Sequence, residues 1–124
     1  MSLQSGEWKI NDNGVESTLT IGSVNPKNGE VTGQIATVGN FVGVWDETSR
    51  AFTFAVPIGG AGVLVQRFYK GFLFSTPRNP DPGQDVVWTL AGFVQVIDLP
   101  AAIENRGNAR RTIFGWFAQI TEVA

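Results

Sequence analysis

Short segments in which apolar and polar residues alternate, separated by turn residues, run through the whole chain. In Glu16–Val24 the apolar Leu19 and Ile21 alternate with Thr18 and Thr20, which is the period-two pattern of a half-buried β-strand. Turn residues recur at short and fairly even intervals, as is typical of a sandwich or a barrel. No segment keeps the 3.6-residue period of an amphipathic helix over ten residues or more. The pattern therefore predicts an all-β protein.

Seven connections predict eight strands, each beside its neighbour in the sequence. The predicted strands are Glu7–Ile10, Glu16–Val24, Val31–Val38, Phe41–Trp45, Ala51–Val56, Val63–Thr76, Asp85–Ile97 and Arg110–Glu122. Eight neighbouring antiparallel strands leave two open edges unless the sheet closes on itself. We therefore predict an eight-stranded antiparallel up-and-down β-barrel. One short helical turn is expected at Leu99–Asn105, after the seventh strand. Residues 6–124 are expected to form a single domain, preceded by a tail of residues 1–5 that is compatible with a cloning scar.

The last three predicted strands are apolar on both faces, although the outer face of a barrel wall should be polar where it meets water. In the sixth strand, for example, Phe68 and Phe72 share one face and Tyr69 and Leu73 share the other. A contiguous apolar face of this kind marks an interaction surface. We expect a homo-oligomer, a dimer or a tetramer, joined through the sixth to eighth strands. A thicker core or a covering loop is the alternative.

Composition narrows the classes of function. The 124 residues include no cysteine and no histidine, which removes disulfides, thiolate metal sites and the commonest general base. The net charge is −2 and the only adjacent basic pair is Arg110–Arg111, so no nucleic-acid partner is expected. No apolar run approaches the ~20 residues of a membrane span, and no signal peptide precedes Gly6. The alternative that the protein is secreted and has lost a signal peptide stays open, and no cellular compartment is assigned.

Candidate catalytic chemistry is sparse. The acidic residues in predicted turns are expected to be solvated, and they are Asp12, Asp46, Glu47, Asp81, Asp98 and Glu104. None forms the converging carboxylate pair that general acid–base catalysis needs. The glycine-rich Gly59–Gly62 leads into a strand and not a helix, unlike a phosphate-binding loop. We expect no enzyme activity, no cofactor and no metal. A small aromatic-lined barrel suits either a small-ligand site or an interior filled by its own side chains.

The segment Gly6–Asn40, GEWKINDNGVESTLTIGSVNPKNGEVTGQIATVGN, resembles the N-terminal third of the avidin–streptavidin family. In that family a Gly-x-Trp strand leads to an Asn-bearing turn, then a Thr-Ile strand, then a Gly-x-x-Thr-Gly strand. The later stretches RFYKGFLF, VVWTLAGF and RRTIFGWFAQI are similar to its sixth, seventh and eighth strands. The resemblance implies an eight-stranded oligomeric barrel that binds biotin without catalysis, through polar partners of the ureido group and tryptophans around the ligand.

Carried over by position, the resemblance implies six ligand-binding residues. They are Asn11 and Ser17 near the ureido group, Thr37 on the third strand, Asn40 in the closing loop, Tyr69 on the sixth strand and Trp88 on the seventh. Two polar partners are replaced, because Ile35 stands at the family's third-strand tyrosine and Phe117 at its eighth-strand aspartate. Each lost partner of a buried polar group costs ~1–3 kcal/mol. We therefore expect weakened binding of biotin or a related heterocycle. The alternative is a side-chain-filled barrel that serves as a structural or protein-interaction domain without biotin binding.

Overall fold

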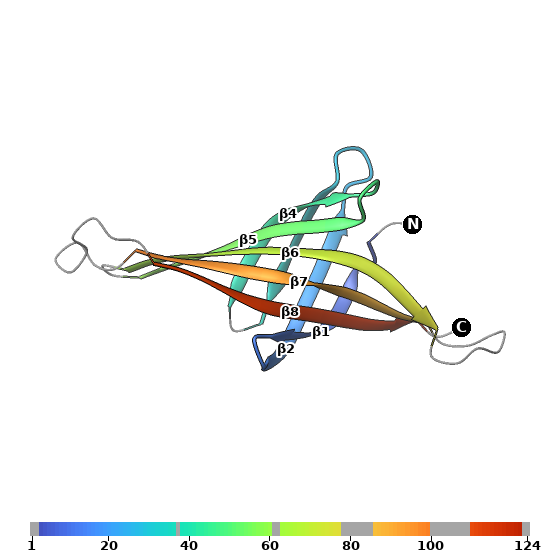
Figure 1. The fold of residues 1–124 in the computed structure, drawn as a ribbon. Helices are drawn as coiled ribbons and strands as arrows, with labels where there is room; N and C mark the ends of the chain where they lie inside the picture. The colour runs from blue at the N-terminus through green and yellow to red at the C-terminus, as the bar shows by residue number, and fades with distance from the viewer. Residues whose placement is uncertain (1–2, 37, 61–62, 78–85, 100–109, 123–124) are drawn as a thin grey trace.

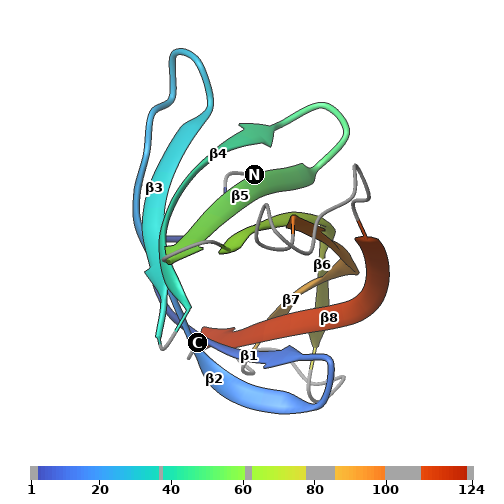
Figure 2. The same ribbon diagram turned by 90° about the vertical axis from the view of Figure 1, so that its left-hand side faces the viewer.

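The described part of the chain forms one closed barrel of eight antiparallel strands (Figures 1 and 2). The computed structural model describes residues 3–36, 38–60, 63–77, 86–99 and 110–122. The strands are β1 (Gly6–Asp12), β2 (Val15–Val24), β3 (Glu30–Ile35), β4 (Gly39–Asp46), β5 (Ala51–Gly60), β6 (Val63–Pro77), β7 (Val86–Leu99) and β8 (Arg110–Glu122). Each strand pairs with its sequence neighbours and β1 pairs with β8, which closes the sheet without crossovers. The predicted fold class is confirmed.

These described ranges contain no helix, and hence none that is long and apolar enough to cross a membrane. The helical turn expected after the seventh strand lies mostly outside the described residues, because β7 ends at Leu99 and the description resumes at Arg110. At the other end of the chain, Leu3 is buried in the core and the backbone oxygen of Gln4 accepts a hydrogen bond from Trp8 Nε1 at 3.1 Å. Residues 3 and 4 therefore pack against the barrel.

Tight turns close the first hairpins in the way the sequence predicts. The β1–β2 turn places Asn13 and Gly14 at φ values of 52° and 88°, the left-handed region that asparagine and glycine tolerate best. The fifth strand is longer than predicted, since it runs through Pro57 to Gly60. In the described structure β5 pairs with β4 only over Ala51–Ala55, so Pro57 lies where the strand has no β4 neighbour. A residue without an N–H is tolerated at such an open edge.

The interior of the barrel is packed with aromatic side chains. Phe54 and Tyr69 are stacked with ring centroids 4.5 Å apart and an interplanar angle of 5°. Phe41 lies 4.4 Å from Phe54 on the other side, and Trp116 meets both Phe54 and Tyr69 edge to face. Trp8 is fully buried in the same core. Such pairs add about 0.5–1.5 kcal/mol each beyond their burial. The middle of the barrel is thus occupied by the chain's own rings.

Trp116 also explains a glycine row across the long strands. Its Nε1 donates to the backbone oxygen of Phe93 at 2.9 Å, so the indole lies flat against β6 and β7. A Cβ at Gly71 would stand 2.7 Å from Trp116 Cζ2, and one at Gly92 would stand 1.9 Å from the backbone oxygen of Lys70. Glycine at these positions lets the ring and the neighbouring backbone approach closely.

The strands β6, β7 and β8 are the longest, with 15, 14 and 13 residues, and they extend beyond the rest of the wall (Figure 1). Their outer surface carries six large exposed apolar side chains, with exposed fractions from 42% to 50%. Five of them, which we call the apolar face, are Phe68, Phe72, Phe74, Phe93 and Ile113, and the sixth is Phe117 on β8. The same strands bury Tyr69, Leu90 and Trp116 on the inner side. The prediction that these strands are apolar on both faces is therefore confirmed.

Candidate functional site

The end of the barrel that carries the β1–β2 and β3–β4 turns, here called the mouth, holds a cluster of polar side chains. Along β1 the residues Trp8, Ile10 and Asp12 alternate inward, which brings the Asp12 carboxylate into the wall interior with only 8% of its surface exposed. From the facing strand β6, Arg67 and Tyr69 point inward by the same alternation. The three side chains meet above the stacked aromatic core.

One carboxylate oxygen joins the cluster. The Tyr69 hydroxyl donates to Asp12 Oδ2 at 2.6 Å, and Arg67 Nη1 donates to the same oxygen at 3.1 Å. Arg67 Nη1 also lies 3.4 Å from the Tyr69 hydroxyl oxygen. Charge-assisted hydrogen bonds of this kind are about twice as strong as neutral ones. The cluster therefore fixes the position of all three side chains.

The environment holds Tyr69 and Arg67 each in one protonation state. Burial raises the pKa of Tyr69 well above its ordinary value, and the hydrogen bond to Asp12 adds to the rise, so the phenol stays neutral and donates. Burial opposes the charge of Arg67, but the hydrogen bond with Tyr69 and the nearby charges of Asp12 and Asp98 outweigh it and raise the pKa of Arg67. The mouth thus contains a permanent guanidinium between carboxylates.

Two polar edges of the cluster are not used by the chain. Within the described residues, Arg67 Nε is buried without an acceptor, and Arg67 Nη2 has no hydrogen-bond partner either. Both bonds to Asp12 go to Oδ2, which leaves Oδ1 without a partner in the same part of the chain. The cluster therefore keeps an unpaired donor edge on Arg67, whose Nε is buried, and an unpaired acceptor atom on Asp12.

A cavity of about 300 Å³ opens beside this cluster. Its lining residues are Asp12, Asn13, Val15, Ser17, Ile35, Val38, Arg67 and Phe114. Four of these are apolar, so a small ligand would meet hydrophobic walls and a few fixed polar atoms, which is the usual composition of a small-molecule site.

The structure brings two of the predicted site residues to the mouth. Ser17 lines the cavity, and its Oγ donates to the backbone oxygen of Ala36 at 2.9 Å. Tyr69 lies at the floor of the mouth in the cluster just described. Thr37 lies outside the described residues.

The other three predicted residues lie elsewhere. Asn11 is on the outer surface of β1, because it is three residues from Trp8 and no bulge restores the inner face; its Oδ1 accepts the Gly14 N–H at 2.8 Å. Asn40 is exposed at the start of β4, opposite Gln34. Trp88 is buried in the interior, but it lies six residues along β7 from the strand partner of Tyr69, about 20 Å away. The five of these residues that the structure describes therefore do not lie together.

Asp12 and Arg67 are the two mouth residues that sequence reasoning missed. Asp12 was expected to be a solvated turn residue, and this expectation is wrong, because β1 continues two residues past the predicted end at Ile10 and buries the carboxylate. The alternation of Trp8, Ile10 and Asp12 along the chain could have predicted that Asp12 faces inward. For Arg67, the spacing of two residues from Tyr69 on a predicted strand could have predicted that both side chains share a face.

The two replaced family positions also separate in space. Ile35 faces inward and lines the mouth cavity, as the alignment predicts. Phe117 faces outward with 44% of its surface exposed, opposite Asn11 of β1, so it does not enter the barrel. An aspartate at residue 117 would thus lie outside the mouth as well.

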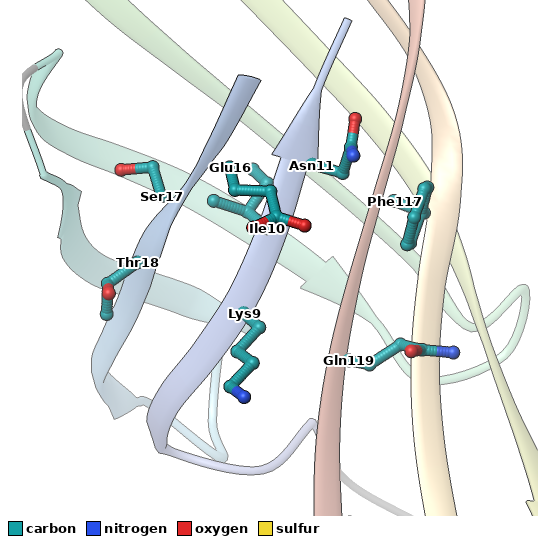
Figure 3. Close-up of a pocket in the computed structure, with 8 residues that line it drawn as sticks. All are labelled: Lys9, Ile10, Asn11, Glu16, Ser17, Thr18, Phe117 and Gln119. Atoms are coloured by element: carbon teal, nitrogen blue, oxygen red, sulfur yellow. The ribbon is translucent and has the colours of Figure 1, made fainter. Parts of the chain in front are cut away.

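A second cavity, of about 440 Å³, lies on the outer wall where β8, β1 and β2 run side by side (Figure 3). The side chains that face it from outside the barrel are Lys9, Asn11, Glu16, Thr18, Phe117 and Gln119. This outer cavity contains Asn11, the predicted residue that the mouth lacks. Within the described ranges, no group of three or more acidic side chains is placed to hold a metal ion.

Comparisons of this chain with protein-family models, with curated proteins and with solved structures gave no match. The barrel itself is consistent with an avidin-like fold, since it has eight antiparallel strands in up-and-down order and a closed sheet.

Proposed function

We propose that the protein is a non-catalytic small-molecule binding protein of avidin-like type, which holds the polar end of a small heterocycle at the barrel mouth. The observation that carries this proposal is that Arg67, with an unpaired donor edge, and Asp12, with an unpaired Oδ1, both line a cavity of about 300 Å³ whose other walls are largely apolar. A cyclic urea or amide presents an N–H and a C=O on one edge. The N–H suits Asp12 and the C=O suits Arg67.

Biotin or a related heterocycle is the candidate ligand, with an affinity below the usual level of the avidin family. Ile35 lines the mouth and cannot donate to a ureido oxygen. The Arg67 edge supplies a donor there, but its side chain is also held by Asp12. Ligand binding must therefore compete with an existing ion pair, which lowers the net gain.

The packed interior favours a second candidate, a side-chain-filled barrel that acts as a structural or protein-interaction domain. Tyr69 is stacked on Phe54, and both rings are buried in the interior of the barrel. A ligand therefore has only the depth of the mouth available, above Tyr69. Either candidate is non-enzymatic, because the chain has no histidine and the Asp12 carboxylate is held by Arg67.

Calorimetric titration with biotin and with 2-imidazolidone, the bare cyclic urea, tests the first candidate. Arg67→Lys keeps the positive charge beside Asp12 but removes the planar fork, so we expect binding to weaken about tenfold or more. Arg111→Lys is the matched control, because it is the same substitution at a residue that is exposed on the outer surface of β8. Equal affinity in both variants would exclude the Arg67 edge from the site. No heat with either compound would favour the filled barrel.

The apolar face supports one further part of the proposal, which is self-association as a dimer or tetramer through β6–β8. Its five exposed apolar side chains form a contiguous surface of the kind that marks interfaces.

A further inference from the structure

The outer cavity is separate from the barrel mouth, although Ser17 lines both. Its six outward side chains stand in two rows across β8, β1 and β2. In one row, Lys9 of β1 lies opposite Gln119 of β8 on one side and Thr18 of β2 on the other. In the next row, Asn11 lies in the same way between Phe117 and Glu16. A hydrogen-bonded sheet holds these side chains at fixed spacings.

Two amide groups of the cavity are held in defined orientations. Asn11 Oδ1 accepts the Gly14 N–H at 2.8 Å, which leaves the Nδ2 donors of Asn11 for a ligand. Gln119 Nε2 donates to Thr89 Oγ1 at 3.2 Å, which leaves Gln119 Oε1 as an acceptor. The cavity therefore presents one oriented donor and one oriented acceptor, and neither has to be reorganised on binding.

The charged residues add a second donor and a second acceptor. Lys9 and Glu16 are diagonal neighbours on β1 and β2, where side chains are about 7–8 Å apart before they reach toward each other. They form no ion pair within the part of the chain that the structure describes. Both are exposed, so each can meet a ligand without first breaking a contact.

Phe117 supplies an apolar platform at the β8 side of the cavity. Its ring is 44% exposed, and its cross-strand neighbours are Asn11 on β1 and the small Ala91 on β7. Figure 3 shows the ring of Phe117 on the side of β8 away from Asn11, with Gln119 further along the same strand. The ring is thus flanked by polar groups on a rigid surface.

We propose that the outer cavity binds a saccharide and places one hexopyranose ring against Phe117. A sugar ring has an apolar face of C–H groups that can cover an aromatic side chain. Around its edge are hydroxyls, each of which both donates and accepts hydrogen bonds. This combination matches the donors of Asn11 and Lys9, the acceptors of Gln119 and Glu16, and the central apolar ring. The site is open, so a neutral ligand that stays partly hydrated fits it better than one whose charge must be desolvated.

The test is backbone amide NMR of the whole protein titrated with methyl β-D-glucopyranoside and methyl β-D-galactopyranoside at high millimolar concentration. At least one glycoside should shift signals of Lys9, Asn11 and Gln119, while Val38 and Arg67 at the mouth stay unmoved. Phe117→Ala should weaken binding about tenfold. Val42→Ala is the matched control, because Val42 is also an exposed apolar residue of the outer wall and lies outside both the cavity and the apolar face.

Asn11→Asp separates a ligand contact from a structural role. The aspartate keeps an acceptor for the Gly14 N–H but has no amide donor, so the turn should be preserved while sugar binding weakens several-fold. Unchanged sugar binding in Asn11→Asp or Phe117→Ala would overturn the proposal. So would shifts induced by glycine, a zwitterionic probe, in the absence of shifts with either glycoside. Because the mouth ligands are titrated separately, failure here leaves the proposed function of the mouth standing, and the reverse also holds.

Discussion

Tyr69 marks the boundary between the packed interior and the polar mouth. One face of its ring is stacked on Phe54, and its hydroxyl donates to Asp12 at the floor of the cavity. A hydroxyl buried this deeply must have a partner, since an unpaired one costs about 1–3 kcal/mol. Asp12 is that partner, and Arg67 in turn balances its charge. The polar chemistry of the mouth therefore depends on a single aromatic side chain.

The ionisation of Tyr69 gives a direct residue-scale prediction. Burial raises the pKa of Tyr69 in the folded protein, whereas the unfolded chain keeps the ordinary value of about 10. Above pH of about 10 the unfolded state therefore loses a proton that the folded state retains, and the free energy of unfolding falls as pH rises. Tyr69 is the single tyrosine of the chain, so tyrosinate absorbance follows it alone. We expect no tyrosinate at pH 10 in the native protein and half-ionisation in denaturant.

Tyr69→Phe provides the control for this titration. The variant removes the absorbance change and with it the part of the alkaline loss of stability that arises from the phenol. A midpoint near pH 10 in the native protein would mean that Tyr69 is solvated and that the cluster with Asp12 does not form.

Asn11 and Asp12 show how far residue-level prediction reaches. The sequence places both at the end of the first strand. In a strand, a residue shares the face of a buried residue when it is an even number of positions away, and takes the opposite face when the number is odd. Trp8 is buried, so Asp12, four residues later, faces inward, and Asn11, three residues later, faces outward. The resemblance to a family therefore predicted Asn11 as the residue of the barrel mouth, whereas the spacing from Trp8 predicts Asp12.

At the scale of elements, strand number and order were predictable, and strand ends were not. The Asn-Gly and Asp-rich turns define the hairpins locally, because these residues adopt the backbone angles that tight turns need. Pro57 was read as the start of a connection, yet β5 continues through it. That outcome depends on the absence of a β4 partner beside Pro57 in the described structure, which no local pattern reveals. The contact between Asp12 and Arg67, 55 residues apart, is likewise set by the closed sheet.

The close approach of β6 and β7 leads to an element-scale prediction. A Cβ at Gly92 would lie 1.9 Å from the backbone oxygen of Lys70 and 2.8 Å from Gly71 Cα, so two strands must separate to admit it. Overpacking of this kind typically costs about 1–3 kcal/mol. We expect Gly92→Ala to lower the free energy of unfolding by at least the lower end of that range, measured by urea denaturation.

Gly115→Ala is the control for the same chemical change on the adjacent strand. Its Cβ would meet Gly92 O at 3.9 Å, an ordinary contact, so stability should change little at the same protein concentration. If the two variants were equally stable, the close packing of β6 against β7 would not hold in solution.

At the scale of the whole molecule, β7 places a large and a small outward side chain, Phe93 and Ala91, two residues apart at the apolar face. Phe93 projects between Lys70 and Gly115, which are its neighbours on β6 and β8. In the adjacent row the small Ala91 lies between Phe72 and Phe117. A two-fold axis between Phe93 and Ala91 would place the projecting ring of each copy over Ala91 of the other. Closed two-fold symmetry is the commonest arrangement of oligomers.

The last prediction tests this assembly. Phe72→Lys combined with Phe93→Lys should dissociate the protein, because each copy would bring two ammonium groups into an apolar interface. Light scattering should then give the monomer mass of 13.4 kDa for the variant and a multiple of it for the parent. Val42→Lys with Val44→Lys is the matched control, since both valines are exposed on the outer surface of β4, with exposed fractions of 62% and 55%, outside the apolar face. It should keep the parent's mass. A parent that scatters as a monomer at micromolar concentration would contradict self-association, and dissociation by the β4 pair would place the interface on a different wall of the barrel.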